Sequence, residues 1–165
     1  MNTRPAPLTA DKALQKLASL CAKRELCCYD ARQRLFRWGV PQAEHDSIID
    51  QLVMRGFIDD MRFAQMFVEE KTTINQWGRR KVEQELRRRG IDSADIAQLF
   101  DGIQPQQTLE TLRALLLRKH RTINAKNDYE RTQKLIRYAM TRGYSWDDIR
   151  QALPQDTQMP EEFNV

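Results

Sequence analysis

Residues 86–91 read Leu86-Arg87-Arg88-Arg89-Gly90-Ile91, and the same spacing of an apolar residue, a glycine and a second apolar residue occurs twice more. The other copies are Leu35-Phe36-Arg37-Trp38-Gly39-Val40 and Ala139-Met140-Thr141-Arg142-Gly143-Tyr144. A glycine one turn after an apolar helical residue can adopt the left-handed conformation that ends a helix, and the next apolar residue then packs back. The three copies therefore predict three helix ends, each with a glycine at positive φ.

The spacing of these glycines indicates an internal repeat. They lie 51 and 53 residues apart, which is a period of about fifty residues. Apolar residues recur at the helical period along the chain, and no convincing alternation of apolar and polar residues lies between turn signals. The sequence therefore predicts an all-α fold with three helices in each repeat. The predicted helices are 11–27, 31–38, 42–55, 60–72, 78–89, 93–101, 105–120, 128–142 and 146–153.

The repeat also predicts how the chain is divided. We expect three tandem three-helix repeats at residues 11–56, 57–103 and 104–153, between a flexible N-terminus at 1–10 and an acidic tail at 154–165. A three-helix unit of about fifty residues leaves apolar surface at both ends, and stacking such units buries those ends. We therefore expect an elongated, curved array, either right-handed or left-handed.

Composition excludes several classes of protein. The longest apolar run, Ala114–Leu117, is far shorter than the roughly 20 residues that span a membrane. The N-terminus has no apolar segment typical of a secretory signal. Three cysteines, two of them the adjacent Cys27 and Cys28, make no disulfide framework, and we expect this adjacent pair to act as small, partly buried hydrophobic residues. We therefore expect a cytoplasmic monomer with no membrane partner.

The sequence contains no pattern of residues typical of a catalytic or metal site. The glycine-rich phosphate-binding motifs, the zinc-protease histidine motif and the nucleophile-elbow motif are all missing. His45 and His120 have no Cys or His at metal-ligand spacing, and lone histidines usually titrate at the surface. The acidic pairs 59–60 and 147–148 each open a predicted helix, where carboxylates stabilise the helix dipole. We therefore expect no enzyme activity, no cofactor and no metal.

The charge pattern indicates an acidic partner. The net charge of +4 is divided as +3 in residues 1–56, −1 in 57–103, +5 in 104–153 and −3 in the tail. Nineteen of the 27 basic residues are Arg, the side chain best suited to bidentate contacts with phosphate or carboxylate. Nucleic acid and an acidic protein surface are both compatible with this pattern.

Residues 79–89 carry the strongest local charge signal. At 100° per residue, Val82 and Leu86 form a narrow apolar stripe with basic residues opposite. Within the predicted helix 78–89, Arg80 and Arg88 have no acidic residue four positions away; the acidic residue four positions after Arg88, Asp92, lies beyond the Gly90 turn. This segment is either a solvated helix face or a surface that binds phosphate or carboxylate.

A second basic cluster ends the predicted helix 105–120, where the helix dipole also favours cations. The candidate partner- or phosphate-binding residues in the two clusters are Arg79, Arg80, Lys81, Arg87, Arg88, Arg118, Lys119 and Arg121. For Trp38, Trp77 and Trp146, each beside a predicted helix end, we expect core packing rather than base stacking.

Three ordered motifs resemble those of a known family. Gly78-x-x-Lys81-Val82-x-x-Glu85-Leu86-x-x-Arg89-Gly90-Ile91 resembles the central signature of the bacterial RecX regulatory proteins. Arg55-Gly56-Phe57-Ile58-Asp59-Asp60-Met61-Arg62-Phe63-Ala64 is similar to the segment that precedes it in that family. Arg142-Gly143-Tyr144-Ser145-Trp146-Asp147-Asp148-Ile149 is similar to the family's last repeat. The resemblance covers about residues 12–153 and is weakest in the first repeat.

The resemblance implies both a fold and a function. It implies three tandem three-helix repeats. RecX proteins bind the RecA recombinase filament on single-stranded DNA, inhibit its extension and promote its loss, so that strand exchange, ATP hydrolysis and coprotease activity fall. For this chain the resemblance implies a non-enzymatic regulator of homologous recombination, DNA repair and the SOS response. Its implied partners are the RecA filament and, weakly or indirectly, single-stranded DNA.

Two other functions stay open at the level of sequence. A helix, a glycine turn and a second helix also describe a helix-turn-helix DNA-binding protein. Against it, the predicted helix 93–101 is acidic where a recognition helix should be basic, and no dimerisation element is obvious. A helical scaffold for protein contacts is the third possibility.

Overall fold

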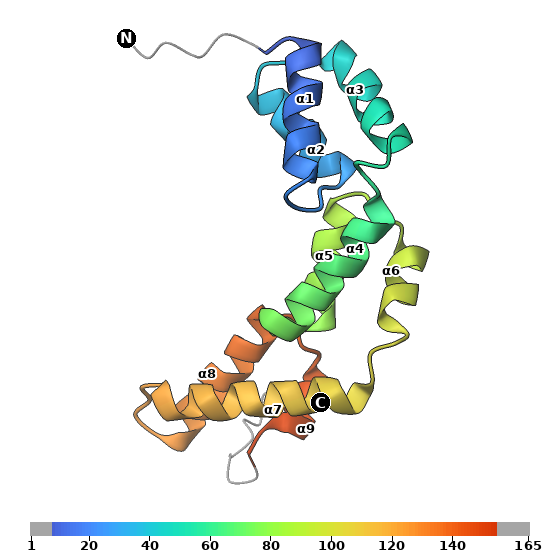
Figure 1. Ribbon diagram of the computed structural model, residues 1–165. Coiled ribbons are helices and arrows are strands. Elements are labelled where there is room, and N and C mark those ends of the chain that lie inside the picture. Colours follow the sequence, from blue (N-terminus) through green and yellow to red (C-terminus); the bar gives the residue numbers. More distant parts are fainter. Residues whose placement is uncertain (1–7, 155–165) are drawn as a thin grey trace, which may run out of the picture. The chain divides into compact units, whose positions relative to one another are not determined.

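The computed structural model describes residues 8–154 of the 165-residue chain. Within that range the chain forms nine α-helices and one short π-helix, and no strand (Figure 1). The prediction of an all-α fold is therefore confirmed. The helices are α1 (Ala10–Cys21), α2 (Cys28–Arg37), α3 (Gln42–Met54), α4 (Asp60–Glu69), the π-helix η1 (Glu70–Ile74), α5 (Arg79–Arg88), α6 (Ser93–Phe100), α7 (Pro105–Thr122), α8 (Asp128–Thr141) and α9 (Trp146–Ala152).

Most of the two predicted tails lies outside the described residues. Of the N-terminal segment 1–10, the structure describes the last three residues. The backbone N–H of Leu8 donates to the carbonyl of Trp38 at 3.1 Å, and the Leu8 side chain packs against the core formed by the first three helices. Of the acidic tail 154–165, only Pro154 is described.

The first predicted helix, 11–27, is wrong at its end. α1 stops at Cys21, and α2 begins at Cys28, three residues before the start predicted for the second helix. Leu26 and Cys27 are both buried, but Cys27 has an extended backbone and its Sγ accepts the N–H of Asp30 at 3.4 Å. The apolar pattern of residues 22–27 therefore reflects a buried connection and a helix cap rather than another helical turn.

The three predicted glycine turns are confirmed. Gly39, Gly90 and Gly143 have φ values of 71°, 83° and 89°. In each turn the apolar residue after the glycine donates its N–H to the carbonyl of the apolar residue one turn before it, as in a Schellman motif. These bonds are Val40 to Leu35 at 3.1 Å, Ile91 to Leu86 at 3.2 Å and Tyr144 to Ala139 at 3.2 Å.

The chain divides into two compact units. The first comprises the residues up to Met66 together with 86–95, and the second comprises 67–85 together with 96 onward. The segment predicted as the middle repeat, 57–103, contributes residues to both units.

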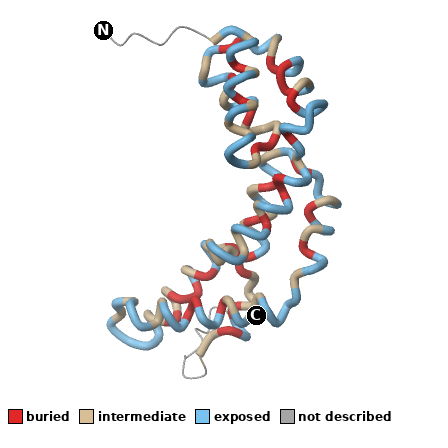
Figure 2. Tube along the Cα trace, viewed as in Figure 1, coloured by how far each residue is buried: buried red, intermediate tan, exposed pale blue. Residues whose placement is uncertain are grey.

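In the first unit, α3 packs against α1 and α2, with the buried positions on the facing sides of the helices (Figures 1 and 2). Its core includes Leu17, Leu35 and Leu52. His45 also lies in this interior at 2% exposure, and its Nε2 is 2.9 Å from the carbonyl oxygen of Val40. The expectation of a surface histidine is therefore wrong for His45, because it occupies the packed face of α3.

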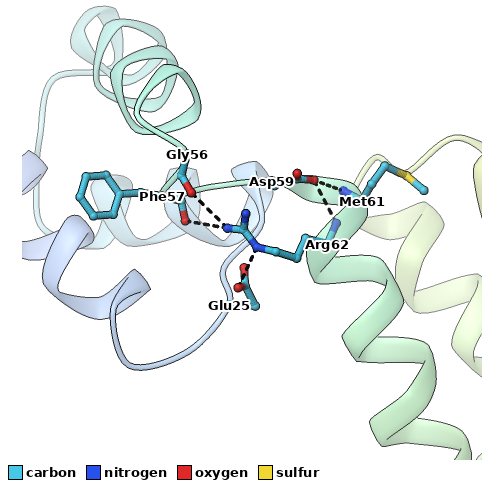
Figure 3. Close-up of polar contacts among 6 residues, drawn as sticks. All are labelled: Glu25, Gly56, Phe57, Asp59, Met61 and Arg62. Atoms are coloured by element: carbon cyan, nitrogen blue, oxygen red, sulfur yellow. Dashed lines mark hydrogen bonds and ion pairs between the residues drawn. The ribbon is translucent and has the colours of Figure 1, made fainter.

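The acidic pair 59–60 opens α4, as its position in the sequence predicts. Asp59 Oδ1 accepts the backbone N–H groups of Met61 and Arg62, both at 2.9 Å (Figure 3). Asp60 Oδ1 accepts the N–H of Cys28 at 2.7 Å, at the start of α2. One aspartate therefore satisfies the exposed donors of α4 itself, and the other satisfies a donor of a neighbouring helix.

Arg62 fastens the turn before α4 to the connection that follows α1. Its Nε donates to the carboxylate of Glu25 at 2.8 Å, and its Nη2 donates to the carbonyls of Gly56 and Phe57 at 3.2 and 3.5 Å (Figure 3). The bond to Glu25 raises the pKa of the Arg62 guanidinium. The motif around residues 55–64 therefore has a structural explanation within the first unit.

In the second unit, α7 packs against α8 and α9, and these two helices also pack against each other. The core includes Leu116, Leu135 and Ile149, all fully buried. Ser145 caps α9, because its Oγ accepts the N–H of Asp148 at 3.1 Å, which confirms the predicted helix start.

Candidate functional site

The predicted basic residues lie on two helices. Arg79, Arg80, Lys81, Arg87 and Arg88 are on α5, and Arg118, Lys119 and Arg121 are near the end of α7. Six of these side chains are exposed, whereas the two lysines are half-buried. Val82 and Leu86, the predicted apolar stripe of α5, are both 0% exposed. The arginines of α5 therefore face solvent, as the helical period predicts.

The residues of α5 belong to different units. Arg79, Arg80 and Lys81 are part of the second unit, together with the α7 cluster, whereas Arg87 and Arg88 are part of the first. Arg79 is held in place, because its Nε donates to Glu83 at 2.6 Å and its guanidinium lies 4.8 Å from the centroid of Phe100. Part of its charge is therefore already neutralised within the helix.

The start of α5 packs directly on the turn around Gly143. The N–H of Gly78 donates to the carbonyl of Arg142 at 2.7 Å, and the N–H of Arg80 donates to the carbonyl of Gly143 at 3.1 Å. A Cβ on Gly78 would collide with the backbone of Gly143, and a Cβ on Gly143 would lie 2.5 Å from the backbone N of Lys81. The two backbones approach this closely only because both positions are glycine.

Sequence reasoning missed the part that Gly78 plays. Gly78 does not have a left-handed φ, so no turn conformation requires a glycine there. The only local signal is a glycine directly before the first residue of a helix, and this signal does not name the partner, which lies 65 positions later in the sequence.

A hollow of about 240 Å³ lies beside this contact. Arg80 and Lys81 line it from α5, with Met140 and Thr141 from the end of α8. Lys81 Nζ donates to the carbonyl of Thr141 at 3.5 Å, and Met140 is 48% exposed. Glu85 is also part of the lining. Two cations beside an exposed apolar side chain suit an acidic group from a partner.

The loop before α5 joins the basic end of α7 to the same region. Arg118 donates to the side chain of Gln76, and Arg142 Nη1 donates to the carbonyl of Asn75 at 2.7 Å. The hydroxyl of Tyr144 donates to the carbonyl of Gln76 at 3.0 Å, and burial raises the pKa of Tyr144 to about 12. The structure therefore brings Arg118 to the segment that precedes α5, within the second unit.

The adjacent cysteines, Cys27 and Cys28, are poor candidates for a catalytic or metal-binding role. Burial raises the pKa of Cys27 to about 12 and that of Cys28 to about 11. Both thiols are therefore almost entirely protonated at neutral pH, and a protonated thiol is a weak nucleophile and a weak metal ligand.

Residues 8–154 contain no group of three or more His, Cys, Asp or Glu side chains arranged to hold a metal ion. No helix in the same range is both long enough and apolar enough to cross a membrane.

Two models of a known protein family match this chain in sequence. The second three-helix domain of RecX matches residues 59–99, and the third matches residues 106–153. The chain is similar to two solved structures. One is a regulatory protein RecX, with a TM-score of 0.77 at 22% identity over 87% of this chain and 72% of that one. The other is RecX from Lactobacillus salivarius, with a TM-score of 0.68 at 16% identity over 87% and 93% of the two chains.

Three proteins of similar sequence are each a regulatory protein RecX. That of Chromobacterium violaceum is 30% identical over 138 residues, which cover 84% of this chain and 86% of the relative. That of Vibrio parahaemolyticus is 28% identical over 91% of this chain and 94% of the relative. That of Clostridium tetani is 29% identical over 79% of this chain, which spans only 59% of that longer protein. The chain therefore belongs to the RecX family of regulatory proteins.

Proposed function

We propose that this protein binds the RecA recombinase filament on single-stranded DNA and inhibits its extension and activities, without catalysing a reaction itself. The regulatory role follows from the family, and it would modulate homologous recombination and the response to DNA damage. The observation that carries the proposal is the basic surface of α5, which turns its arginines to solvent while its apolar stripe is fully buried.

The chemistry of this surface suits the proposed partner. Arg80 and Arg88 are exposed, so their guanidinium groups are accessible to a partner that offers carboxylates or phosphates. A planar guanidinium binds either group with two parallel hydrogen bonds, which gives orientation as well as affinity. A recombinase filament on DNA presents both kinds of anion.

The proposal also includes the division of the chain into repeats and its oligomeric state. We place the three repeats at residues 11–56, 57–103 and 104–153, followed by the acidic tail at 154–165, in a cytoplasmic monomer. Small-angle scattering of the full chain should then give the mass of a monomer and an elongated envelope. A dimer mass or a spherical envelope would contradict this organisation.

A sequence-specific helix-turn-helix protein has less support. α6 follows the Gly90 turn, in the position of a recognition helix, and its eight residues, SADIAQLF, include no basic side chain. α9 follows the Gly143 turn and has Asp147 and Asp148 in its first turn. Carboxylates at the start of such a helix would repel DNA phosphates, where recognition helices normally contact the duplex.

The test is RecA-driven ATP hydrolysis on single-stranded DNA with increasing amounts of this protein. We expect the rate to fall, and we expect the protein to bind RecA-coated strands more tightly than bare single strands or duplex at about 150 mM salt. Unchanged hydrolysis at saturating protein would contradict the proposal. Tight binding to one duplex sequence would favour the helix-turn-helix function instead.

A further inference from the structure

Two aromatic rings of the second unit are each flanked by two cations. The centroid of the Trp77 ring is 5.4 Å from Lys71 Nζ and 4.2 Å from Lys81 Nζ. The centroid of the Tyr138 ring is 5.0 Å from Lys119 Nζ and 4.9 Å from Arg142 Cζ. We call this set the cationic strip; its members are Lys71, Trp77, Lys81, Arg142, Tyr138 and Lys119.

The two halves of the cationic strip are joined by hydrogen bonds. Lys81 Nζ donates to the carbonyl of Thr141 at 3.5 Å, and Thr141 is the neighbour of Arg142 in sequence. Arg142 Nη1 in turn donates to the carbonyl of Asn75 at 2.7 Å, two residues before Trp77. The strip is therefore continuous from the π-helix η1 through the start of α5 and the end of α8 to the end of α7.

The rings hold the cations in place before any ligand arrives. All four cations are half-buried, so their positions are restricted and their charged groups have lost part of their hydration. A ring face stabilises a cation near it and covers its apolar stem. Glu70 lies 2.6 Å from Lys71 Nζ at one end of the strip. Such preorganised charges attract an anion more strongly than mobile surface lysines do.

The composition of the strip favours phosphate over a protein surface. Three of its four cations are lysines, and lysine is depleted from protein–protein interfaces. Lysine binds phosphate as a point charge and neutralises nucleic-acid backbones without reading sequence. Because cations already lie over the faces of Trp77 and Tyr138, these rings are not available as platforms for stacking bases.

We infer that the cationic strip binds the phosphodiester backbone of single-stranded DNA directly and without sequence preference. This contact is separate from the arginines of α5. The choice of single-stranded DNA as the polyanion rests on the proposed function, since that strand runs through the filament. Through this contact the protein binds DNA in the absence of RecA.

The experiment measures binding of the full chain to a labelled oligothymidylate of about 15 nucleotides by fluorescence anisotropy, without RecA, over a series of salt concentrations. The test variant is Lys71→Gln/Lys81→Gln/Lys119→Gln. The matched control, Arg113→Gln/Lys126→Gln/Arg150→Gln, removes three exposed cations of the same unit from outside the strip. Both variants have the same net charge, so they separate position from overall charge.

We expect the test variant to bind at least about tenfold more weakly at low salt. Each phosphate contact on a single strand contributes about 0.7 to the slope of log affinity against log salt, so losing three contacts should lower the slope by about 2. The single variant Lys119→Gln should lower it by about 0.7, and it serves as the test if the triple variant does not fold. The control variant should keep the wild-type slope.

Two further comparisons test the roles of the Tyr138 ring and of the DNA bases. Tyr138→Leu removes the ring that holds Lys119 and Arg142, whereas Tyr138→Phe keeps it. The first change should weaken binding severalfold, and the second should not. A strand without bases should bind within about threefold of the oligothymidylate, because only backbone contacts are proposed.

Equal losses in test and control variants would overturn the inference, because net charge alone would then explain binding. It would also be overturned if the test variant kept its affinity for DNA but lost inhibition of RecA, since the strip would then face protein. A wild-type chain that binds DNA through the strip but leaves RecA activity unchanged would refute the proposed function and leave this inference standing.

Discussion

The turns at Gly90 and Gly143 have the same sequence pattern and backbone but different surroundings. Their φ values are 83° and 89°, and in both the following N–H closes the turn at 3.2 Å. A Cβ on Gly90 would meet no atom within 4 Å, whereas a Cβ on Gly143 would lie 2.5 Å from the backbone N of Lys81. The local pattern thus determines how the chain turns, and a distant segment determines how much room the turn has.

The largest effect should come from adding a methyl group at the crowded turn. Gly143→Ala combines a left-handed φ with a collision against α5, so we expect it to lower the free energy of unfolding by about 3–5 kcal/mol. Gly78→Ala meets the collision alone and should cost about 1–3 kcal/mol. Urea denaturation of the purified variants measures both values. A Gly143→Ala protein as stable as wild type would contradict the close packing.

Gly90→Ala should have a smaller effect, because only the left-handed φ opposes the methyl group. We expect a loss of about 1 kcal/mol in the free energy of unfolding. The same denaturation experiment measures it. A loss equal to that of Gly143→Ala would show that conformation, and not packing, governs both turns.

Tyr144 extends the comparison to the residue that follows the crowded glycine. Tyr144→Phe removes the hydrogen bond to Gln76 and should cost about 1 kcal/mol at neutral pH. Burial raises the pKa of Tyr144 from 10.0 to about 12, so its folded form holds the proton more tightly than its unfolded form. This stabilisation is complete below pH 10 and is lost as the pH rises towards 12.

The advantage of wild type over Tyr144→Phe should therefore shrink above pH 10. Thermal unfolding of both proteins between neutral pH and about pH 11 tests this. A constant difference in stability across that range would mean that the phenol is not buried in the folded protein.

The smallest effect should come from Gly102→Ala. This glycine has neither a left-handed φ nor any atom within 4 Å of an added Cβ. We expect a change within about 0.5 kcal/mol, which makes the variant the baseline for the series. A large loss at Gly102 would show that an added methyl group costs stability even without crowding or strain.

These turns also show what the sequence could and could not predict. Local conformation and helical period determine the helix ends at Gly39, Gly90 and Gly143. They also determine the burial of Val82 and Leu86. All of these features were therefore predictable from the sequence. The early end of α1 and the burial of His45 depend on which faces pack together. The contact of Gly78 with Gly143 and the pairing of cations with Trp77 and Tyr138 join distant segments, so no local pattern encodes them.

A stability control accompanies the functional test. Leu86 is fully buried under the exposed arginines of α5, so Leu86→Ala leaves the basic surface unchanged and creates a cavity. We expect it to cost about 2–5 kcal/mol of stability and to reduce inhibition of RecA only through unfolding. Normal inhibition per folded molecule confirms that Leu86 acts on stability alone.

The most direct test of the functional account is inhibition of RecA-driven ATP hydrolysis by Arg80→Glu/Arg88→Glu beside wild type. Both side chains are exposed, so we expect the double variant to keep its helical spectrum and melting temperature nearly unchanged. Its inhibition should be several-fold weaker, and the difference should shrink as salt rises, because screening weakens the new repulsion. A folded double variant that inhibits as strongly as wild type would show that the arginines of α5 are only a solvated surface.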